Sequence, residues 1–231
     1  MRSGPQKLMR LVAVSLLGGM CVLGSLNSAA AKTCPDAKVN PSVIFINDDA
    51  KTILNREKSS VEITQLSQSV GALRNHGSRK LLGLAYTKMR PDLRVRVSAR
   101  EERKGTFCIV LTEVKMAFDT VSSVVFVDRK YRPGSCEYRA ILEHEMEHMT
   151  INRRVLGKYK TLLEQRLERK SANIRPFKTT SMQAGAEIVS NRLMADMKSL
   201  IDEFFEVRQR ENNKIDTRNS YAVVKRKCNN W

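Results

Sequence analysis

The chain has 231 residues and a formal net charge of +17. It contains no internal repeat and no low-complexity segment, which excludes repeat architectures and low-complexity chains. Such a positive charge attracts anionic polymers, which outside the cytoplasm means envelope lipids or wall material sooner than nucleic acid. Because most charge runs are solvated, a plain basic surface is the alternative interpretation.

Residues 1–31 have the layout of a secretory signal. A positive start precedes an apolar run from Leu11 to Leu26, and Ala29 and Ala31 are the small residues that a signal peptidase reads. We therefore expect cleavage after Ala31 and an exported protein, periplasmic or extracellular. The mature chain would have a charge of +14, because the signal contains three cations, and no transmembrane span. An uncleaved anchor is the alternative, although the glycines in the run make a poor membrane span.

Residues 32–231 are sufficient for one domain with a substantial core. Within residues 32–131 we predict mostly strands, with one helix over residues 60–75. The predicted strands are the apolar or alternating runs Val43–Ile46, Leu82–Tyr86, Leu93–Ala99, Phe107–Leu111 and Val121–Val127. Pro91 is expected to break the region, and Glu101–Gly105 to form a polar turn. Consecutive strands joined by short turns predict a mostly antiparallel meander.

The pattern changes to helical after Pro133 and Gly134. Ser135 is a suitable N-cap, and helical spacing continues to about Lys170. A second long helix is predicted from a capping box at Thr180 to about residue 211. Residues 135–215 should therefore form a helical hairpin, followed by a C-terminal segment over 216–231. The predicted fold is α+β, with a small, mostly antiparallel sheet packed on two long antiparallel helices.

The segment His144–His148 follows the pattern H-E-x-x-H on the first of these helices. Positions i and i+4 lie on the same helix face, so His144 and His148 can hold one Zn²⁺ ion. The metal lowers the pKa of water, and Glu145 can serve as the general base when that water attacks a carbonyl. This spacing predicts a zinc-dependent hydrolase.

Two ordinary helix histidines are the alternative interpretation of the same motif. The chain has only three histidines, and two of them form it. The face that carries the motif continues with Ile141, Val155, Tyr159 and Leu162, so this face should turn inward. A buried glutamate between two histidines is unfavourable unless a positive charge compensates it, which favours a metal.

Catalytic zinc sites usually have a third protein ligand. A metzincin-type continuation needs a histidine where this chain has Arg154, so we expect a carboxylate from another segment. If the long helices form an antiparallel hairpin, equal counts from its ends place Glu203 level with His148. Glu203 is the predicted third ligand, Asp196 is the reserve, and a solvated Glu203 is the alternative.

Four cysteines remain after removal of residues 1–31, and an even number in an exported chain predicts two disulfides. Four cysteines allow three pairings, and the sequence cannot decide among them. We favour Cys34 with Cys228, which would tie the termini, and Cys108 with Cys136, which would fix the helix to a strand. A second zinc site is the competing use, but no C-x-x-C pair supports it.

The signal, the cysteine-bearing strand, the H-E-x-x-H helix and the segment Ile215–Thr217 together resemble a family of secreted bacterial zinc-dependent proteases of the zincin type. The resemblance implies a zincin-like domain and peptide-bond hydrolysis. Family members often close with Asp, Thr and a His-Gly pair. Asp216 and Thr217 match this pattern, whereas the segment ending in Tyr221 replaces the histidine. Tyr221 can donate a hydrogen bond to the tetrahedral oxyanion instead, and a structural tyrosine is the alternative.

The leading prediction is a secreted zinc metallopeptidase that acts on a protein or peptide substrate. The second is a catalytically silent module that binds anionic cell-envelope material and keeps its metal for structure. Neither involves nucleic acid. Glu145 discriminates between them, because a structural zinc site does not need a general base.

Overall fold

The central strand of the sheet is β4 (Thr106–Val127), which pairs on both sides. On one side it pairs antiparallel with β3 (Gly83–Arg103) along its whole length. On the other side lie β1 (Ser42–Ile46) and β2 (Ile53–Asn55), both parallel to β4, and the antiparallel β5 (Phe177–Thr179). β3 is therefore an edge strand within the part of the chain that the structure describes.

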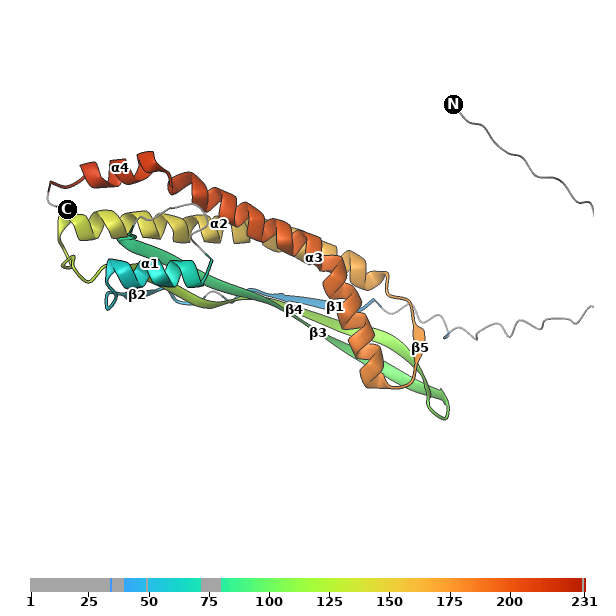
Figure 1. The fold of residues 1–231 in the computed structure, drawn as a ribbon. Coiled ribbons are helices and arrows are strands. Elements are labelled where there is room, and N and C mark those ends of the chain that lie inside the picture. The colour runs from blue at the N-terminus through green and yellow to red at the C-terminus, as the bar shows by residue number, and fades with distance from the viewer. Residues whose placement is uncertain (1–33, 35–39, 49, 72–79, 230) are drawn as a thin grey trace, which may run out of the picture. The chain divides into compact units, whose positions relative to one another are not determined.

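This computed structural model describes residues 34, 40–48, 50–71, 80–229 and 231, all within one unit, Thr33–Trp231. Over these residues it has five strands and four helices, which confirms the α+β prediction (Figure 1). The predicted signal over residues 1–31 lies outside the described residues.

The prediction of a mostly antiparallel meander is wrong. The four short strands expected between residues 82 and 127 are two long ones joined at Lys104 and Gly105, and β1 and β2 run parallel to β4. Pro91 does not end β3, because proline is tolerated on an edge strand, where the ladder does not need its missing N–H. Periodicity identifies a strand, but the connections decide its direction.

Two long helices form the predicted antiparallel hairpin. α2 (Cys136–Ala172) begins at the expected N-cap, because Ser135 accepts a hydrogen bond from the backbone N–H of residue 138. α3 (Met182–Ile215) is capped by Ser181 in place of the expected Thr180. Two shorter helices, α1 (Ser60–Ser69) and α4 (Arg218–Arg226), complete the helical part.

The core lies between one face of the sheet and the α2–α3 hairpin. Phe118 of β4 meets Phe204 of α3 edge to face, with ring centroids 5.0 Å apart. Tyr159 and Leu163 of α2 and Leu193 of α3 are fully buried beside them. The expectation that Leu162 lies on this inward face is wrong, because its neighbour Leu163 fills the core position and Leu162 is exposed. This packing holds α2 over the sheet and directs one face of the helix inward.

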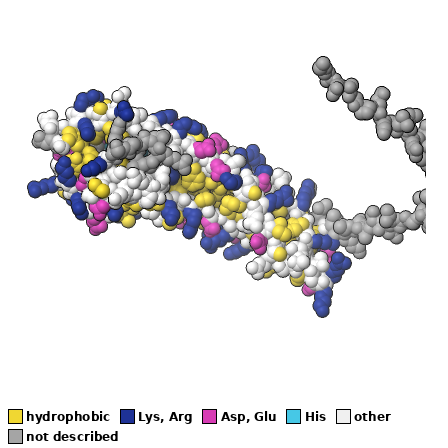
Figure 2. Space-filling view, in the orientation of Figure 1, with side chains coloured by type: hydrophobic (Ala, Val, Ile, Leu, Met, Phe, Trp, Pro, Cys, Tyr) yellow, Lys and Arg dark blue, Asp and Glu magenta, His cyan; other side chains and the backbone are white. Residues whose placement is uncertain are grey.

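The surface is basic, as the charge predicts. Arg94 and Arg96, on one face of β3, expose 81% and 78% of their side chains. Figure 2 shows Lys and Arg spread over the visible face, with no single basic tract. No helix in the described residues has both the length and the apolar character required to cross a membrane.

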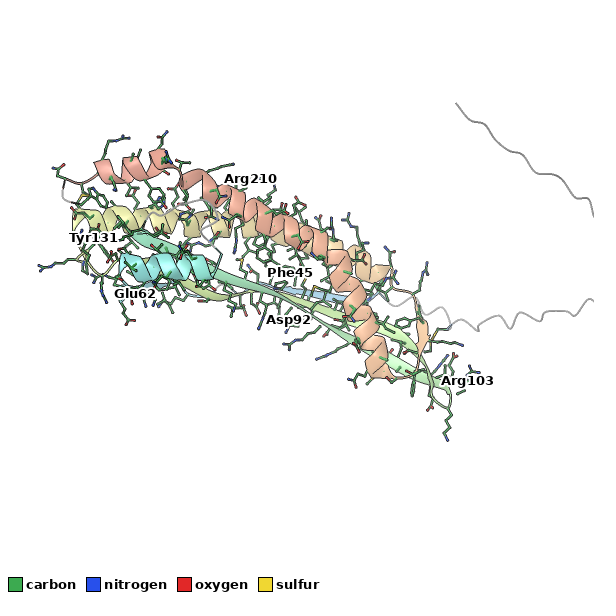
Figure 3. The ribbon with its side chains drawn as sticks, viewed as in Figure 1. Phe45, Glu62, Asp92, Arg103, Tyr131 and Arg210 are labelled. Atoms are coloured by element: carbon green, nitrogen blue, oxygen red, sulfur yellow. A yellow bond between two sulfur atoms is a disulfide. The ribbon has the colours of Figure 1, made fainter. Side chains whose placement is uncertain are left out.

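The structure has two disulfides, as predicted, but the favoured pairing of Cys34 with Cys228 and Cys108 with Cys136 is wrong. The bonds join Cys34 to Cys108 and Cys136 to Cys228. Cys108 lies near the start of β4, about 60 Å of extended strand before the end that leads into α2. In Figure 3, Arg103 at the tip of the hairpin and Tyr131 just before α2 accordingly lie at opposite ends of the sheet.

Candidate metal centre

The motif on α2 faces inward. His144, Glu145 and His148 expose only 7%, 5% and 8% of their surface. The two imidazole centroids are 5.0 Å apart, as expected for positions i and i+4 of a helix. The structure therefore brings the three predicted motif residues together in a buried environment.

The third member of the group is Asp216, at the C-cap of α3. Its Oδ1 lies 3.2 Å from Nε2 of His144 and 3.1 Å from Nε2 of His148. One ligand atom from each of these residues lies within 4.8 Å of the others, and among the described residues this is the group of three or more such side chains that could hold a metal ion. Two imidazoles and one carboxylate form a donor set suited to a divalent transition metal.

The site favours the charged forms of Asp216 and His148, although both side chains are largely buried. Burial opposes the carboxylate form of Asp216, but hydrogen bonds from both histidines hold its pKa well below the usual range. Burial likewise opposes the imidazolium form of His148, yet Asp216 and the charge of Glu145 raise its pKa to about 9. The two carboxylates thus create a strong preference for positive charge between them, which a metal ion satisfies.

The tautomer of His148 is set by Asn212 on α3. The amide nitrogen of Asn212 donates to the backbone oxygen of Arg208, 2.7 Å away, and to Asn152 Oδ1, 2.9 Å away. Because a backbone oxygen can only accept, the amide oxygen of Asn212 must be the atom that faces His148 Nδ1, at 2.7 Å. Nδ1 therefore carries a proton, which makes Nε2 the atom that can bind a metal.

This network continues to the sheet. The amide nitrogen of Asn152 donates to Thr87 Oγ1 of β3 at 3.2 Å, and that hydroxyl lies 3.5 Å from Met149 Sδ. Side chains from α2, α3 and β3 are thus joined behind His148. None of these supporting polar residues was among the sequence-predicted site residues, because their partners lie 60 or more positions away.

Glu145 packs directly against the start of β3. It accepts a hydrogen bond from the backbone of Ala85, and burial raises its pKa although both histidines act in the opposite direction. A Cβ on Gly83 would lie 2.7 Å from Glu145 Oε1 and 2.7 Å from Ile141 Cγ2. The missing side chain at Gly83 therefore creates the space that the carboxylate occupies.

Tyr221 also reaches the group, from α4. Its hydroxyl donates to Asp216 Oδ1 at 3.1 Å, and its ring centroid is 5.3 Å from that of His144. The sequence-predicted candidate Tyr221 therefore lies beside His144 and the C-cap carboxylate.

The structure places Glu203 elsewhere, so its prediction as third ligand is wrong. Glu203 accepts a hydrogen bond of 2.7 Å from the hydroxyl of Tyr159, about 16 Å along α2 from His148. The reserve candidate Asp196 is still farther away and pairs with Lys170 at 2.9 Å.

The error arose from the alignment of the two helices. His148 is level with Asn212, and Lys170, near the end of α2, is already level with Asp196. The first turns of α3 therefore extend past the end of α2 towards β5 (Figure 1). The prediction assumed that the end of α2 is level with the start of α3, and this assumption shifts the register between the two helices by about a dozen residues. Asp216 had one sequence signal, its match to the closing Asp-Thr of the family pattern.

Two cavities adjoin the group. One of 160 Å³ has mostly polar walls from α2, α3 and β3, with Glu145 and His148 in its lining. The other, of 550 Å³, is mainly apolar and meets the group at His144 and Tyr221. Its apolar lining includes Leu81, Leu82, Ile141, Ala222, Val224 and Trp231. Space for a ligand therefore exists on two sides of the candidate metal-binding group.

Comparisons with protein-family models, with curated proteins and with solved structures gave no match to this chain.

Proposed function

We propose that this protein is an exported zinc-dependent metallopeptidase with a zincin-like site. The observation that carries the proposal is a buried carboxylate, Glu145, next to a ligand group of His144, His148 and Asp216. A site that only binds a metal has no need of a second buried carboxylate that is not one of its ligands. A hydrolase needs it as a general base.

The donor spacing supports zinc. Ligand atoms about 2.0–2.1 Å from a tetrahedral zinc are separated by about 3.3–3.4 Å. The two nitrogen–oxygen separations of 3.2 and 3.1 Å are close to this value. When bound, zinc would supply a Lewis acid that polarises a carbonyl and lowers the pKa of water towards neutrality.

The edge strand β3 supports a peptide substrate. It pairs only with β4 in the described part of the chain, and its first residues, Gly83 and Ala85, contact Glu145. The free edge of a strand can bind an extended peptide through backbone hydrogen bonds. A peptide bound in this way would pass directly beside the general base.

Three residues of the chain have separate roles in the proposed reaction. Glu145 takes the proton of the attacking water and passes it to the leaving amine, and its raised pKa suits this exchange. Tyr221, beside the ligands, can donate a hydrogen bond to the oxyanion of the tetrahedral intermediate. The Asn212 amide holds the His148 ring with Nε2 towards the ligand group.

The second candidate is a silent module that binds anionic envelope material. The basic surface favours it (Figure 2). Two disulfides are compatible with an exported protein under either proposal. The space that Gly83 provides for Glu145 favours catalysis, because envelope binding makes no use of that carboxylate.

The test is Glu145→Gln, with Glu147→Gln as a matched control from the same motif. Glu147 is exposed, so its change should leave both zinc content and hydrolysis as in the wild type. Glu145→Gln should keep zinc but reduce cleavage of a mixed peptide library by at least about 10²–10⁴-fold. Zinc content is measured by elemental analysis. A zinc-loaded wild type that cleaves no peptide would reject the peptidase in favour of the silent module.

A further inference from the structure

One cation of the site is not used by the chemistry above. Arg208 of α3 is the one Lys or Arg among the described residues that line the 160 Å³ cavity shared with Glu145 and His148. Burial lowers the pKa of its guanidinium, which means that the charge is partly removed from water.

Within the described part of the chain, Arg208 contacts only neutral groups. Its Nη1 lies 3.3 Å from the thioether sulfur of Met89, which is a weak acceptor. Its guanidinium carbon lies 5.9 Å from the ring centroid of Phe204 and 5.3 Å from that of Phe205. Other cations on the hairpin do have carboxylate partners, such as Arg154.

These contacts orient a guanidinium without neutralising it. Both aromatic rings lie within the range of a cation–π attraction, which holds the group in place but supplies no negative charge. A partly buried charge without a counter-ion is unfavourable, and a bound anion would relieve that cost. Because a guanidinium has five N–H donors in a fork that matches a carboxylate, a carboxylate is a well-suited ligand.

We propose that Arg208 is a specificity residue that binds a carboxylate of the peptide substrate inside this cavity. The identity of the ligand as a peptide rests on the function proposed above. Arg208 and Asp216 lie two helical turns apart on α3, about 12 Å. An extended peptide covers that length in about three to four residues. The carboxylate is therefore an acidic side chain, or the C-terminus, at about that separation from the scissile bond.

The experiment measures binding separately from hydrolysis. Three matched pools of labelled peptides are titrated against zinc-loaded Glu145→Gln protein by fluorescence anisotropy. One pool is neutral with a C-terminal amide, the second differs by a free C-terminus, and the third is the amide with one Glu in place of Gln. We expect one of the carboxylate pools to bind about 10- to 100-fold more tightly than the neutral pool. The preferred pool identifies the source of the carboxylate.

Arg208→Gln, added to the same protein, should reduce that preference to near unity without weakening the binding of the neutral pool. Arg208→Lys should keep part of it, because lysine retains the charge but loses the two-pronged geometry. Arg210→Gln is the control, an exposed arginine two residues away (Figure 3). It should keep the preference in full, which excludes a general effect of the basic surface.

A preference that survives Arg208→Gln, or equal binding of all three pools, would overturn this assignment. Circular dichroism and the thermal midpoint of each variant show whether the fold is intact, and Arg208→Lys provides the test if the Gln variant does not fold. Carboxylate-dependent binding through Arg208 without any cleavage by the wild type would reject the peptidase and leave the Arg208 site standing. Cleavage by the wild type with no carboxylate preference would reject the Arg208 assignment and leave the peptidase proposal standing.

Discussion

Asn212 is a neutral side chain whose hydrogen bonds hold a histidine in the orientation that a metal requires. It accepts from His148 Nδ1 and donates to the backbone oxygen of Arg208. Such partners of a metal-binding histidine typically change metal affinity by about 10–100-fold when they are removed.

We therefore expect Asn212→Leu to weaken zinc affinity by about 10–100-fold, because His148 loses the acceptor that fixes its tautomer. Competition with a chromogenic chelator measures this. Asn213→Leu is the matched control, since Asn213 is exposed and its side chain contacts Gln209. Equal affinities of the two variants would contradict the role given to Asn212.

The space at Gly83 makes a second prediction at the scale of single residues. Gly83→Ala places a Cβ within 2.7 Å of Glu145 and Ile141, so the free energy of unfolding should fall by about 1–3 kcal/mol. If the proposed function holds, peptide hydrolysis should fall as well, because the proposed general base Glu145 is displaced. Gly157→Ala is the contrast: it lies inside α2 with nothing within 4 Å of the new Cβ. It should stabilise the protein by about 0.5–1 kcal/mol in urea unfolding.

At the scale of elements, the register between α2 and α3 decides which carboxylate meets the histidines. α3 ends beside the motif helix, and its C-cap residue Asp216 turns towards His144 and His148. Glu203, on the same helix, lies at the level of Tyr159. An acidic side chain on α3 is a ligand candidate only if it lies at the right level.

Asp216→Ala should therefore lose most of its zinc, whereas Glu203→Ala should retain the wild-type stoichiometry. Elemental analysis of both proteins after the same dialysis against a weak chelator gives the comparison. Glu203→Ala should lower only stability, by about 0.5–1.5 kcal/mol, through the lost hydrogen bond to Tyr159. If Glu203→Ala loses zinc while Asp216→Ala retains it, Asp216 is not the third ligand and Glu203 is.

At the scale of the whole molecule, covalent links hold the terminal parts of the fold. α4 has no buried residue, yet it carries Tyr221 to the site. The bond between Cys136 and Cys228 joins the end of α4 to the start of α2, and Lys227 pairs with Glu143 at 2.7 Å. This disulfide therefore stabilises the position of a site residue as well as the fold.

Replacing Cys136 and Cys228 with Ser should reduce stability by up to about 4–5 kcal/mol, since the bond closes a loop of 92 residues. Hydrolysis should fall further than zinc content, because Tyr221 loses its support while both histidines and Asp216 stay on α2 and α3. The second disulfide, Cys34–Cys108, provides the control. It lies near the start of β4, at the end of the sheet away from the candidate site. Its removal should reduce stability and leave the activity of the folded fraction unchanged.

What the sequence determined by itself is local. The spacing of His144 and His148 and the N-cap at Ser135 follow from the period of one helix, so they could be predicted from neighbouring residues. The α+β class and the helical hairpin follow from the periods of successive segments. The presence of two disulfides follows from the number of cysteines.

The tertiary structure decided everything that depends on the offset between elements. Asp216, Asn212 and Gly83 approach the motif from segments some 60 or more positions distant, and no local period encodes those meetings. Each residue advances a helix by only about 1.5 Å, so an error of a dozen residues in the hairpin register moves a candidate ligand by about 18 Å. The cysteine pairing failed for the same reason, because the length of β4 separates Cys108 from Cys136. Packing between the sheet and the helices sets these offsets.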